Sequence, residues 1–414
     1  MLGKNNSVNP SFILIITMIC GGGHLQAADA IKKKILADNP ETTILQVDIF
    51  NDWMGKFFGS FFTQCWNTPL RKGHHFISLF TSYFGIPIAD PIFFIPIFIQ
   101  AFLAFQRYPI TEVIDTQPMG TSAICLAMKL SNRLKKQKLV LNKILTEIPT
   151  RRAIHFFHPL KLMPKLLRKL IQLHIVEPFP QEQNFFKRQT GLEKDQIQLI
   201  DPPLREAFFD QMLLDSPKRK IAISFQSDVE KLSIVKIGKL ENYIEEQNEK
   251  SLTLNCQNKS KIITIMLGSQ PHTKVFEKYL DGFINSCKKK PHISYFIFIL
   301  GNPSSPGFED FRISLLYLDS RPKNFHPIIL SIQEQKTVAH LLKYSDLTIT
   351  RSGGLTSMEL LKVEQKNARI HTNFLKEGKP SLKRMPPWEI GNAEVLIEKI
   401  GAKMIHPDLI EFLE

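Results

Sequence analysis

The stretch that decides the fold is Phe12-Ile13-Leu14-Ile15-Ile16-Thr17-Met18-Ile19-Cys20-Gly21-Gly22-Gly23-His24. It opens with a short, unbroken run of apolar and β-branched residues, which is typical of a parallel strand buried on both faces. Three glycines end the run, and the spacing of the apolar residues in 25–37 predicts an amphipathic helix. A second strand is expected over 44–47. This strand–loop–helix–strand unit indicates the start of a doubly wound α/β domain.

The same alternation continues along the chain and begins again at Lys261. In the first half it predicts strands over 110–115 and 138–145. In the second half it predicts helices near 273–288, 337–344 and 357–363, and strands over 262–267, 295–300, 315–318, 328–332 and 347–350. Two tandem α/β halves predict a cleft between them, with ligands at the carboxyl ends of the strands.

A polar, charged connection over 201–260 separates the two halves. Asp201-Pro202-Pro203 indicates a hinge, and 215–260 is interpreted as an insertion or long linker with a helix over 228–247. The length of 414 residues fits two domains of about 200 residues each. We therefore expect an N-terminal Rossmann-like domain over 1–203, a linker or insertion over 204–260, and a C-terminal Rossmann-like domain over 261–414.

Composition narrows the class of protein. Apolar residues make up 43% of the chain and charged residues 22%, which excludes a disordered polymer. The formal net charge of +14 favours an anionic partner, such as nucleic acid, an anionic membrane face or a phosphorylated ligand. The five cysteines are scattered without a CxxC pair, so we expect a reducing cytosol rather than a disulfide framework or zinc site.

Two segments suggest contact with lipid. Residues 53–107 are crowded with Phe, Ile and Trp, and 92–105 is the most apolar part, although Pro91 and Pro96 interrupt it. A pair of core helices, a surface that dips into lipid and a transmembrane span remain open for this segment. Residues 160–175 resemble a basic amphipathic helix, which is either a solvated helix face or a contact for anionic lipid. Lys4 ahead of the apolar run 12–20 also suggests a signal peptide, but a buried strand is the interpretation we prefer because no cleavage site follows.

The first candidate site is Gly21-Gly22-Gly23-His24. Glycines between a buried strand and a helix allow close backbone approach and leave helix N–H groups facing an anion or an electrophilic substrate. A histidine at that point could act as general base on an acceptor hydroxyl. A tight turn with a surface histidine is the alternative.

The second candidate site runs from Arg351 through Ser352, Gly353, Gly354 and Thr356 to Glu359, again between a strand and a helix. Backbone N–H groups and the two hydroxyls could hold a diphosphate, and the carboxylate could accept hydrogen bonds from ribose. A capping box made by Thr356 and Glu359 is the structural alternative. Gly268-Ser269-Gln270 is a third loop at the end of a strand.

Four further segments complete an ordered set of motifs along the chain. They are Ile114-Asp115-Thr116-Gln117-Pro118, Leu145-Thr146-Glu147, Glu389-x-Gly391-Asn392-Ala393 and 397–401. Together with the opening unit, Gly268-Ser269-Gln270 and 351–359, this set resembles the motifs of one GT-B glycosyltransferase family. The family contains monogalactosyldiacylglycerol synthases, processive diacylglycerol glucosyltransferases and the bacterial enzyme that adds N-acetylglucosamine to the peptidoglycan lipid precursor.

The resemblance implies two Rossmann-like domains facing across a cleft, with a UDP-sugar on the C-terminal domain and a lipid such as diacylglycerol on the N-terminal domain. It implies inverting transfer of a hexose at a membrane surface, without a cofactor or an obligatory metal. His24 would be the catalytic histidine, and Glu147 the acidic residue that handles a proton or positions the acceptor. The acceptor-side loop would comprise Gly21, Gly22, Gly23, Gln117 and Pro118. The donor-binding residues would be Gly268, Ser269, Gln270, Arg351, Ser352, Gly353, Gly354, Thr356, Glu359, Glu389 and Asn392.

Other function classes stay open. Trp388 stands where the family has glutamine, and Gln333 lies in the loop expected to grip the uracil. These departures motivate a catalytically degenerate remnant that binds membrane or nucleotide. A basic nucleic-acid binder is a third class. The sequence has no known nucleic-acid-binding motif, so we expect no nucleic acid as a partner. For the enzyme we expect a cytoplasmic location, peripheral on the inner face of an anionic membrane.

Overall fold

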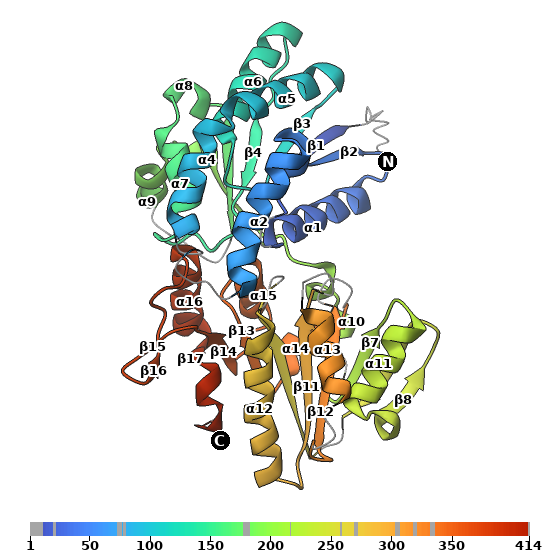
Figure 1. Ribbon diagram of the computed structural model, residues 1–414. Coiled ribbons are helices and arrows are strands. Elements are labelled where there is room, and N and C mark those ends of the chain that lie inside the picture. The colour runs from blue at the N-terminus through green and yellow to red at the C-terminus, as the bar shows by residue number, and fades with distance from the viewer. Residues whose placement is uncertain are drawn as a thin grey trace. The chain divides into compact units, whose positions relative to one another are not determined.

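The computed structural model describes residues 11–19, 22–72, 77, 80–176, 183–215, 217–256, 259–268, 272–302, 307–317, 321–331 and 336–412 (Figure 1). The chain divides into two compact units. Unit 1 comprises Met1–Trp66 and Phe80–Leu204, and unit 2 comprises Asn67–Leu79 and Arg205–Glu414. Each unit is built on its own parallel sheet.

Unit 1 contains a six-stranded sheet in the order β2-β1-β3-β4-β5-β6, and every neighbouring pair is parallel. The strands are β1 (Phe12–Thr17), β2 (Thr43–Asp48), β3 (Glu112–Asp115), β4 (Leu141–Ile144), β5 (Ile171–Val176) and β6 (Ile197–Ile200). Leu14 and Ile16 of β1 pack into one apolar cluster, and Ile13 and Ile15 pack into another on the opposite face. Both faces of β1 are therefore covered, as its unbroken apolar sequence predicts.

Helices lie on both faces of this sheet. Ala28 of α1 (Gly23–Asp38) packs on the face of Ile13 and Ile15. The opposite face is covered by residues of α5 (Phe94–Arg107), α6 (Thr121–Lys135), α7 (Ile154–Leu162), α8 (Lys165–Arg168) and α9 (Gln183–Thr190). The short helix η3 (Lys194–Gln196) leads into β6. This arrangement is a doubly wound α/β domain.

The apolar segment 53–107 forms η1 (Ile49–Trp53), α2 (Lys56–Lys72), η2 (Thr81–Gly85), α4 (Ile86–Ile92) and α5. Along α5, Ile97, Ala101 and Phe105 are fully buried, whereas Ile95 and Leu103 are exposed. Within the described residues, none of the helices alone has the length and apolar composition of a membrane span. The pair Tyr83–Ile92 and Phe94–Arg107 meets the length and composition of a span jointly, but it is bent by 62° at its break.

The predicted basic helix over 160–175 is wrong. Helix α7 ends at Leu162, α8 is a single turn, and β5 begins at Ile171. Pro164 explains the break, because proline disfavours helical backbone at the residue before it, and Met163 is extended with φ −65° and ψ 146°. The lysines and leucines of this segment therefore lie on two short helices and the turns beside them.

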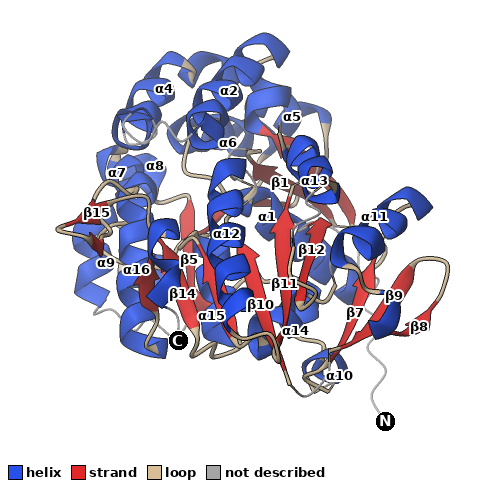
Figure 2. Cartoon of the chain, turned by 60° about the horizontal axis from the view of Figure 1, so that its bottom comes forward, coloured by secondary structure: helices blue, strands red, loops and turns tan. Residues whose placement is uncertain are grey.

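Unit 2 contains a second parallel six-stranded sheet in the order β12-β11-β10-β13-β14-β17 (Figure 2). Its strands are β10 (Ser260–Met266), β11 (Ser294–Gly301), β12 (Phe325–Ser331), β13 (Leu347–Thr350), β14 (Ala368–His371) and β17 (Lys403–Ile405). Its helices are η4 (Glu206–Phe208), α10 (Gln211–Leu214), α12 (Thr273–Lys289), α13 (Phe308–Leu316), α14 (Val338–Tyr344), α15 (Gly354–Lys362), α16 (Pro387–Ile400) and η6 (Pro407–Phe412). A small hairpin, β15 (Leu375–Lys376) with β16 (Lys379–Pro380), precedes α16.

The predicted strand over 315–318 is also wrong. Leu315 lies in α13, where it is buried together with Phe308 and Phe311. That spacing of three and four residues places the three side chains on one helix face. Four apolar residues in a row cannot by themselves distinguish a strand from the end of a helix.

The segment predicted as a linker or insertion has its own secondary structure within unit 2. Strands β7 (Lys220–Ser224), β8 (Ile244–Gln247) and β9 (Ser251–Asn255) form an antiparallel sheet with β9 in the middle. Helix α11 (Asp228–Gly238) ends well before the expected 247, at Lys239, which has a left-handed backbone. A short helix, η5 (Glu241–Tyr243), follows.

Helix α11 lies beside β12, the first strand of the unit 2 sheet (Figure 2). Arg321 Nη1 donates to Ile237 O at 2.6 Å, and His326 Nδ1 lies 2.9 Å from Gly238 O. All seven residues of β12 are buried although it is an edge strand, because this helix and its loop cover it. Two doubly wound units with parallel sheets confirm the predicted fold class, whereas a cleft between them stays a prediction.

Candidate functional site

The first glycine loop joins β1 to α1 in unit 1. Gly22, the residue before the helix, has φ +77°, a backbone conformation that favours glycine. His24 is the second residue of α1, and a Cβ added to Gly23 would meet no atom within 4 Å. The described part of the loop thus leaves open space at the start of the helix, while Gly21 lies outside the described residues.

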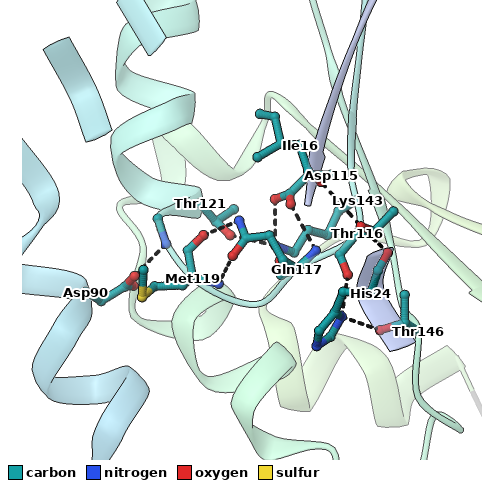
Figure 3. Close-up of polar contacts among 11 residues, drawn as sticks. Ile16, His24, Asp90, Asp115, Thr116, Gln117, Met119, Thr121, Lys143 and Thr146 are labelled. Carbon is teal, nitrogen blue, oxygen red and sulfur yellow. Dashed lines mark hydrogen bonds and ion pairs between the residues drawn. The ribbon is translucent and has the colours of Figure 1, made fainter. Parts of the chain in front are cut away.

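His24 is held through one nitrogen of its ring (Figure 3). Nδ1 lies 2.9 Å from the carbonyl oxygen of Thr116 and 2.9 Å from Oγ1 of Thr146. Because a carbonyl oxygen only accepts hydrogen bonds, we assign the ring hydrogen of the neutral imidazole to Nδ1. This tautomer leaves the lone pair on Nε2, which is the atom that could take a proton from a substrate.

The surroundings keep His24 neutral. Burial lowers its pKa to about 4, the hydrogen bond to Thr116 opposes that effect, and the positive charge of Lys143 adds to it. The ring therefore has an unprotonated Nε2 at neutral pH and is a weak base. His155 on α7, one residue before Phe156, has a pKa lowered well below 6.5 by burial and by its repulsion from His24 and Lys143.

Lys143 is a buried residue of this site that the sequence analysis missed. Its side chain and that of Asp115 are 0% exposed, and Nζ lies 2.7 Å from Asp115 Oδ2. Nζ also donates to Thr121 Oγ1 at 2.8 Å and to the carbonyl oxygen of Gln117. Burial raises the pKa of Asp115, although Lys143 opposes that effect. The signal was available: a lysine in an otherwise apolar strand, beside a strand that ends in aspartate.

The other acceptor-side predictions lie around this cluster. Gln117 is buried, accepts from the backbone N–H of Met119 at 2.7 Å, and donates from its own N–H to Asp115 Oδ1 at 3.1 Å. Pro118 is the next residue of the same turn. Glu147 is buried and directly follows Thr146. The structure thus brings Gln117 and Glu147 into the loops that hold His24.

In unit 2, two glycine loops follow neighbouring strands. Met266 of β10 is paired with Thr350 of β13, so Gly268 and the loop that begins at Arg351 lie at the same edge of the sheet. Gly268 has φ +85°, and a Cβ added to Gly268 or Gly353 would meet no atom within 4 Å. Ser269 and Gln270 lie outside the described residues. The described residues therefore leave space beside the backbone of both loops, at the ends of two adjacent strands.

Helix α15 begins directly after this loop. Gly353 is the residue before the helix and makes no side-chain cap, while Gly354 and Thr356 are the first and third helical residues. The capping box predicted for Thr356 and Glu359 is therefore wrong, because Thr356 lies inside the helix instead of before it. The first N–H groups of α15 point out of its N-terminus with no side chain capping them, as in anion sites.

Four of the predicted donor-binding residues form one hydrogen-bond network. Arg351 pairs with Glu389, with Nη2 2.6 Å from Oε1 and Nε 3.3 Å from Oε2. Ser352 Oγ donates to the carbonyl oxygen of Glu389 at 2.8 Å, and Asn392 Nδ2 donates to the carbonyl oxygen of Ser352 at 2.9 Å. The loop before α15 and the first turns of α16 are therefore joined. Trp388, next to Glu389, is buried, and Gln333 lies outside the described residues.

Glu359 has a partner that the sequence analysis did not identify. Both carboxylate oxygens accept from Arg205, at 2.7 Å from Nε and 2.8 Å from Nη2. Arg205 is the first residue of the second stretch of unit 2. The distance of 154 residues in sequence gave no signal for this pair.

No group of three or more His, Cys, Asp or Glu side chains suited to a metal ion occurs in the part of the chain that the structure describes.

Comparison with known proteins gives no family. No protein-family model and no curated protein matches the chain. Among solved structures, MurG of Acinetobacter baumannii is 14% identical, with 97% of this chain and 87% of that chain covered and a TM-score of 0.43. The glycosyltransferase SsfS6 of Streptomyces sp. SF2575 is 7% identical, with coverages of 95% and 87% and a TM-score of 0.45. The α,α-trehalose-phosphate synthase (UDP-forming) of Burkholderia xenovorans is 10% identical, with coverages of 97% and 90% and a TM-score of 0.46. With every TM-score below 0.5, these likenesses carry no argument on function.

Proposed function

We propose that the chain is a GT-B glycosyltransferase that moves a hexose from a UDP-sugar to a lipid acceptor such as diacylglycerol, with inversion, at a membrane surface. The observation that carries the proposal is the state of His24, a neutral imidazole at a glycine-marked helix start with Nδ1 engaged and Nε2 available. Because this imidazole is unprotonated at neutral pH, its Nε2 can accept the proton of an acceptor hydroxyl, although as a weak base. Glu147 would be the acidic residue on the acceptor side that handles a proton or positions the acceptor.

The donor would bind at the second pair of glycine loops. Gly268 and Gly353 leave space for close backbone approach, and the N-terminus of α15 favours a diphosphate. Glu389 and Asn392, joined to this loop through Arg351 and Ser352, would lie near the sugar. The proposal requires no cofactor, because the nucleotide-sugar is a substrate.

An exposed apolar surface on unit 1 supports action at a membrane. The α2–α5 apolar surface is made by large side chains that are exposed on consecutive helices: Phe57, Phe58, Phe61, Phe80, Tyr83, Phe84, Ile88, Ile92, Ile95, Ile99 and Leu103. Phe57 is 80% exposed and Ile95 is 66% exposed. Many exposed apolar side chains within one segment of the chain are typical of an interaction site, and the net charge of +14 favours anionic lipid as the partner. We therefore propose a cytoplasmic enzyme, peripheral on the inner face of a membrane.

The test is transfer by the purified chain. UDP-glucose, UDP-galactose or UDP-N-acetylglucosamine, mixed with liposomes that contain diacylglycerol and anionic lipid, should yield glycolipid detected by mass spectrometry. His24→Ala should lower the rate by about 10²–10⁴-fold, the usual contribution of a general base. His292→Ala, at an exposed histidine of unit 2, is the matched control and should leave the rate unchanged.

Liposome binding tests the membrane part separately. The double variant Phe57→Ser/Ile95→Ser should sediment with anionic liposomes in a smaller fraction than the native chain does. Met212→Ser, at an exposed apolar residue of unit 2, should sediment in the same fraction as the native chain. Equal liposome binding by the native chain, the double variant and Met212→Ser would contradict a role for the α2–α5 apolar surface.

A catalytically degenerate nucleotide binder is the second candidate. The observation that favours it is that both Glu359 oxygens are engaged by Arg205, so the predicted ribose ligand has a protein partner. Binding of UDP in calorimetry, together with no product from any of the three donors, would support this candidate over the enzyme.

A further inference from the structure

The buried cation of Lys143 is unusual enough to require a role. Lysine is almost never fully buried unless it is paired, and here the ammonium group is 0% exposed. Its hydrogen-bond partners are Asp115, Gln117 and Thr121, which belong to the end of β3, the following turn and the first residue of α6. One side chain on β4 thus fixes three successive parts of the neighbouring strand–turn–helix unit.

That unit carries the group that orients His24. Thr116 lies between Asp115 and Gln117, both of which are bound to Lys143, and its carbonyl oxygen contacts His24 Nδ1 at 2.9 Å. Thr146, whose hydroxyl is the other neighbour of Nδ1, lies three residues after Lys143. Figure 3 shows Thr116 and Thr146 in contact with the histidine, and Lys143 in contact with Asp115, Gln117 and Thr121 beside them. Lys143 is therefore linked to both atoms that hold the ring.

A ring contact adds a third connection. The ammonium group of Lys143 lies 5.8 Å from the centre of the Phe156 ring, and that ring lies 5.9 Å from the ring of His24. Phe156 is buried, so its ring is packed between the ammonium group and the imidazole.

We propose that Lys143 is a positioning residue for His24: its ammonium group binds the ends of β3 and β4 together, so that Thr116 and Thr146 both meet Nδ1 and only Nε2 can act as base. The proposal rests on the function proposed above, in which His24 is the catalytic base. It deepens that function by assigning the residue that selects the tautomer of the base.

The charge of Lys143 has a second, measurable consequence. The charged and titratable groups that interact with His24 are Lys143 on β4 and His155 on α7, and Asp115 on β3 is the ion-pair partner of Lys143. Glu147 lies in the loop after β4, one residue after Thr146. Lys143 is the one whose charge contributes to lowering the pKa of His24. Removal of that charge should therefore raise the pKa of His24, whereas loosening of the loops should let the ring hydrogen occupy either nitrogen.

The experiment is nitrogen NMR of the full chain with ¹⁵N-labelled histidine, with the signals of His24 assigned by their absence in His24→Ala. The native chain should show the hydrogen on Nδ1 and titrate well below pH 6.5. Lys143→Met leaves Asp115 as a buried, unpaired acid, so the second variant is Asp115→Leu with Lys143→Met, which removes both charges and keeps an apolar interior.

In the double variant we expect a mixture of the two tautomers of His24, whereas Lys143→Met alone, which removes only the positive charge, should raise the pKa of His24. Lys138→Met, at an exposed lysine just before β4, is the control and should leave the tautomer and the pKa of His24 unchanged. A folded double variant with the native tautomer would overturn the proposal. The measurement needs no substrate, so a chain that makes no glycolipid contradicts the proposed function without changing this result.

Discussion

Arg205 and Glu359 form a two-point ion pair, with Nε 2.7 Å from Oε1 and Nη2 2.8 Å from Oε2. The carboxylate is 1% exposed and the guanidinium 17% exposed. A paired arginine fork of this geometry is stronger than a single charged hydrogen bond, and loss of one partner leaves the other charge buried. The pair fixes the start of the long C-terminal stretch of unit 2 on helix α15.

Arg205→Met should therefore lower the local stability of α15 by about 3–5 kcal/mol, the usual cost of breaking a buried pair. Hydrogen exchange of the α15 amides is the appropriate measurement, because it reports the local opening of that helix. Arg312→Met is the matched control: in its pair on α13 the Glu309 carboxylate is 57% exposed, so the pair should contribute less than about 1 kcal/mol.

Arg205→Met with Glu359→Leu should recover most of the loss, because an apolar pair leaves no buried charge. If the double variant exchanges as fast as Arg205→Met alone, the ion pair is not the source of the effect.

Gly353→Ala should fold normally and bind UDP poorly. Its backbone, with φ −65° and ψ 152°, suits any residue, and the added Cβ meets no protein atom within 4 Å. In the proposed donor site that space belongs to the diphosphate, so we expect at least a tenfold rise in Kd, or about 1.4 kcal/mol, by calorimetry. Gly23→Ala adds the same methyl group at the other loop and should leave UDP binding unchanged. Unaltered affinity in Gly353→Ala would place the diphosphate elsewhere.

Acid should destabilise unit 1 in a defined pH range. His24 has a pKa of about 4 and His155 has a pKa well below 6.5, so the folded state binds fewer protons than the unfolded state between these values. The contribution of both histidines to stability is complete above about pH 6.5, and that of His24 is lost as the pH falls toward 4. Urea unfolding at pH 7, 6 and 5 should show a falling midpoint, and His155→Phe should reduce the fall.

His292→Phe, at an exposed position, should retain the native dependence on pH. A midpoint that stays constant from pH 7 to pH 5 in the native chain would contradict neutral, buried imidazoles.

Gly59→Ala should destabilise the packing of α2. A Cβ at Gly59 would lie 2.1 Å from the carbonyl oxygen of Phe50 and 2.5 Å from its carbon, which are backbone atoms of η1 that cannot turn aside. We expect a cost of about 1–3 kcal/mol, as for other overpacked interiors. Ser60→Ala, at the next and exposed position, should change the free energy of unfolding by no more than about 0.5 kcal/mol. Urea unfolding measures both changes.

The strands at the centre of each sheet were predictable because burial on both faces leaves an unbroken apolar run. β1, β10 and β11 follow this rule, and their predicted positions agree with the structure. In the two parallel sheets β5, β6, β14 and β17 were missed: β5 lies almost entirely inside the predicted helix over 160–175, and β17 (Lys403–Ile405) is a half-exposed edge strand with a charged residue, so it resembles a loop. Pro164 was visible in the sequence, but the regular spacing of leucines was given more weight than the helix break that proline causes.

The candidate sites were predictable only as far as they follow the chain. Glycine loops and the residues beside them have a local signature, which is how His24 and the 351–356 loop were found. Partners such as Lys143 for Asp115, or Arg205 for Glu359, come from 28 and 154 residues away. A single sequence contains no signal for such pairing beyond a charge at a position where the fold is apolar.

The helix that lies against β12 has a consequence for any shortened form of the chain. Deletion of 217–256 would expose the free N–H and C=O groups of a strand in which every residue is buried, and Arg321 and His326 would lose the carbonyl groups of α11. An open, apolar strand edge pairs readily with the same edge of another molecule. The insertion therefore protects unit 2 from aggregation, and its removal should yield an insoluble protein rather than a smaller one.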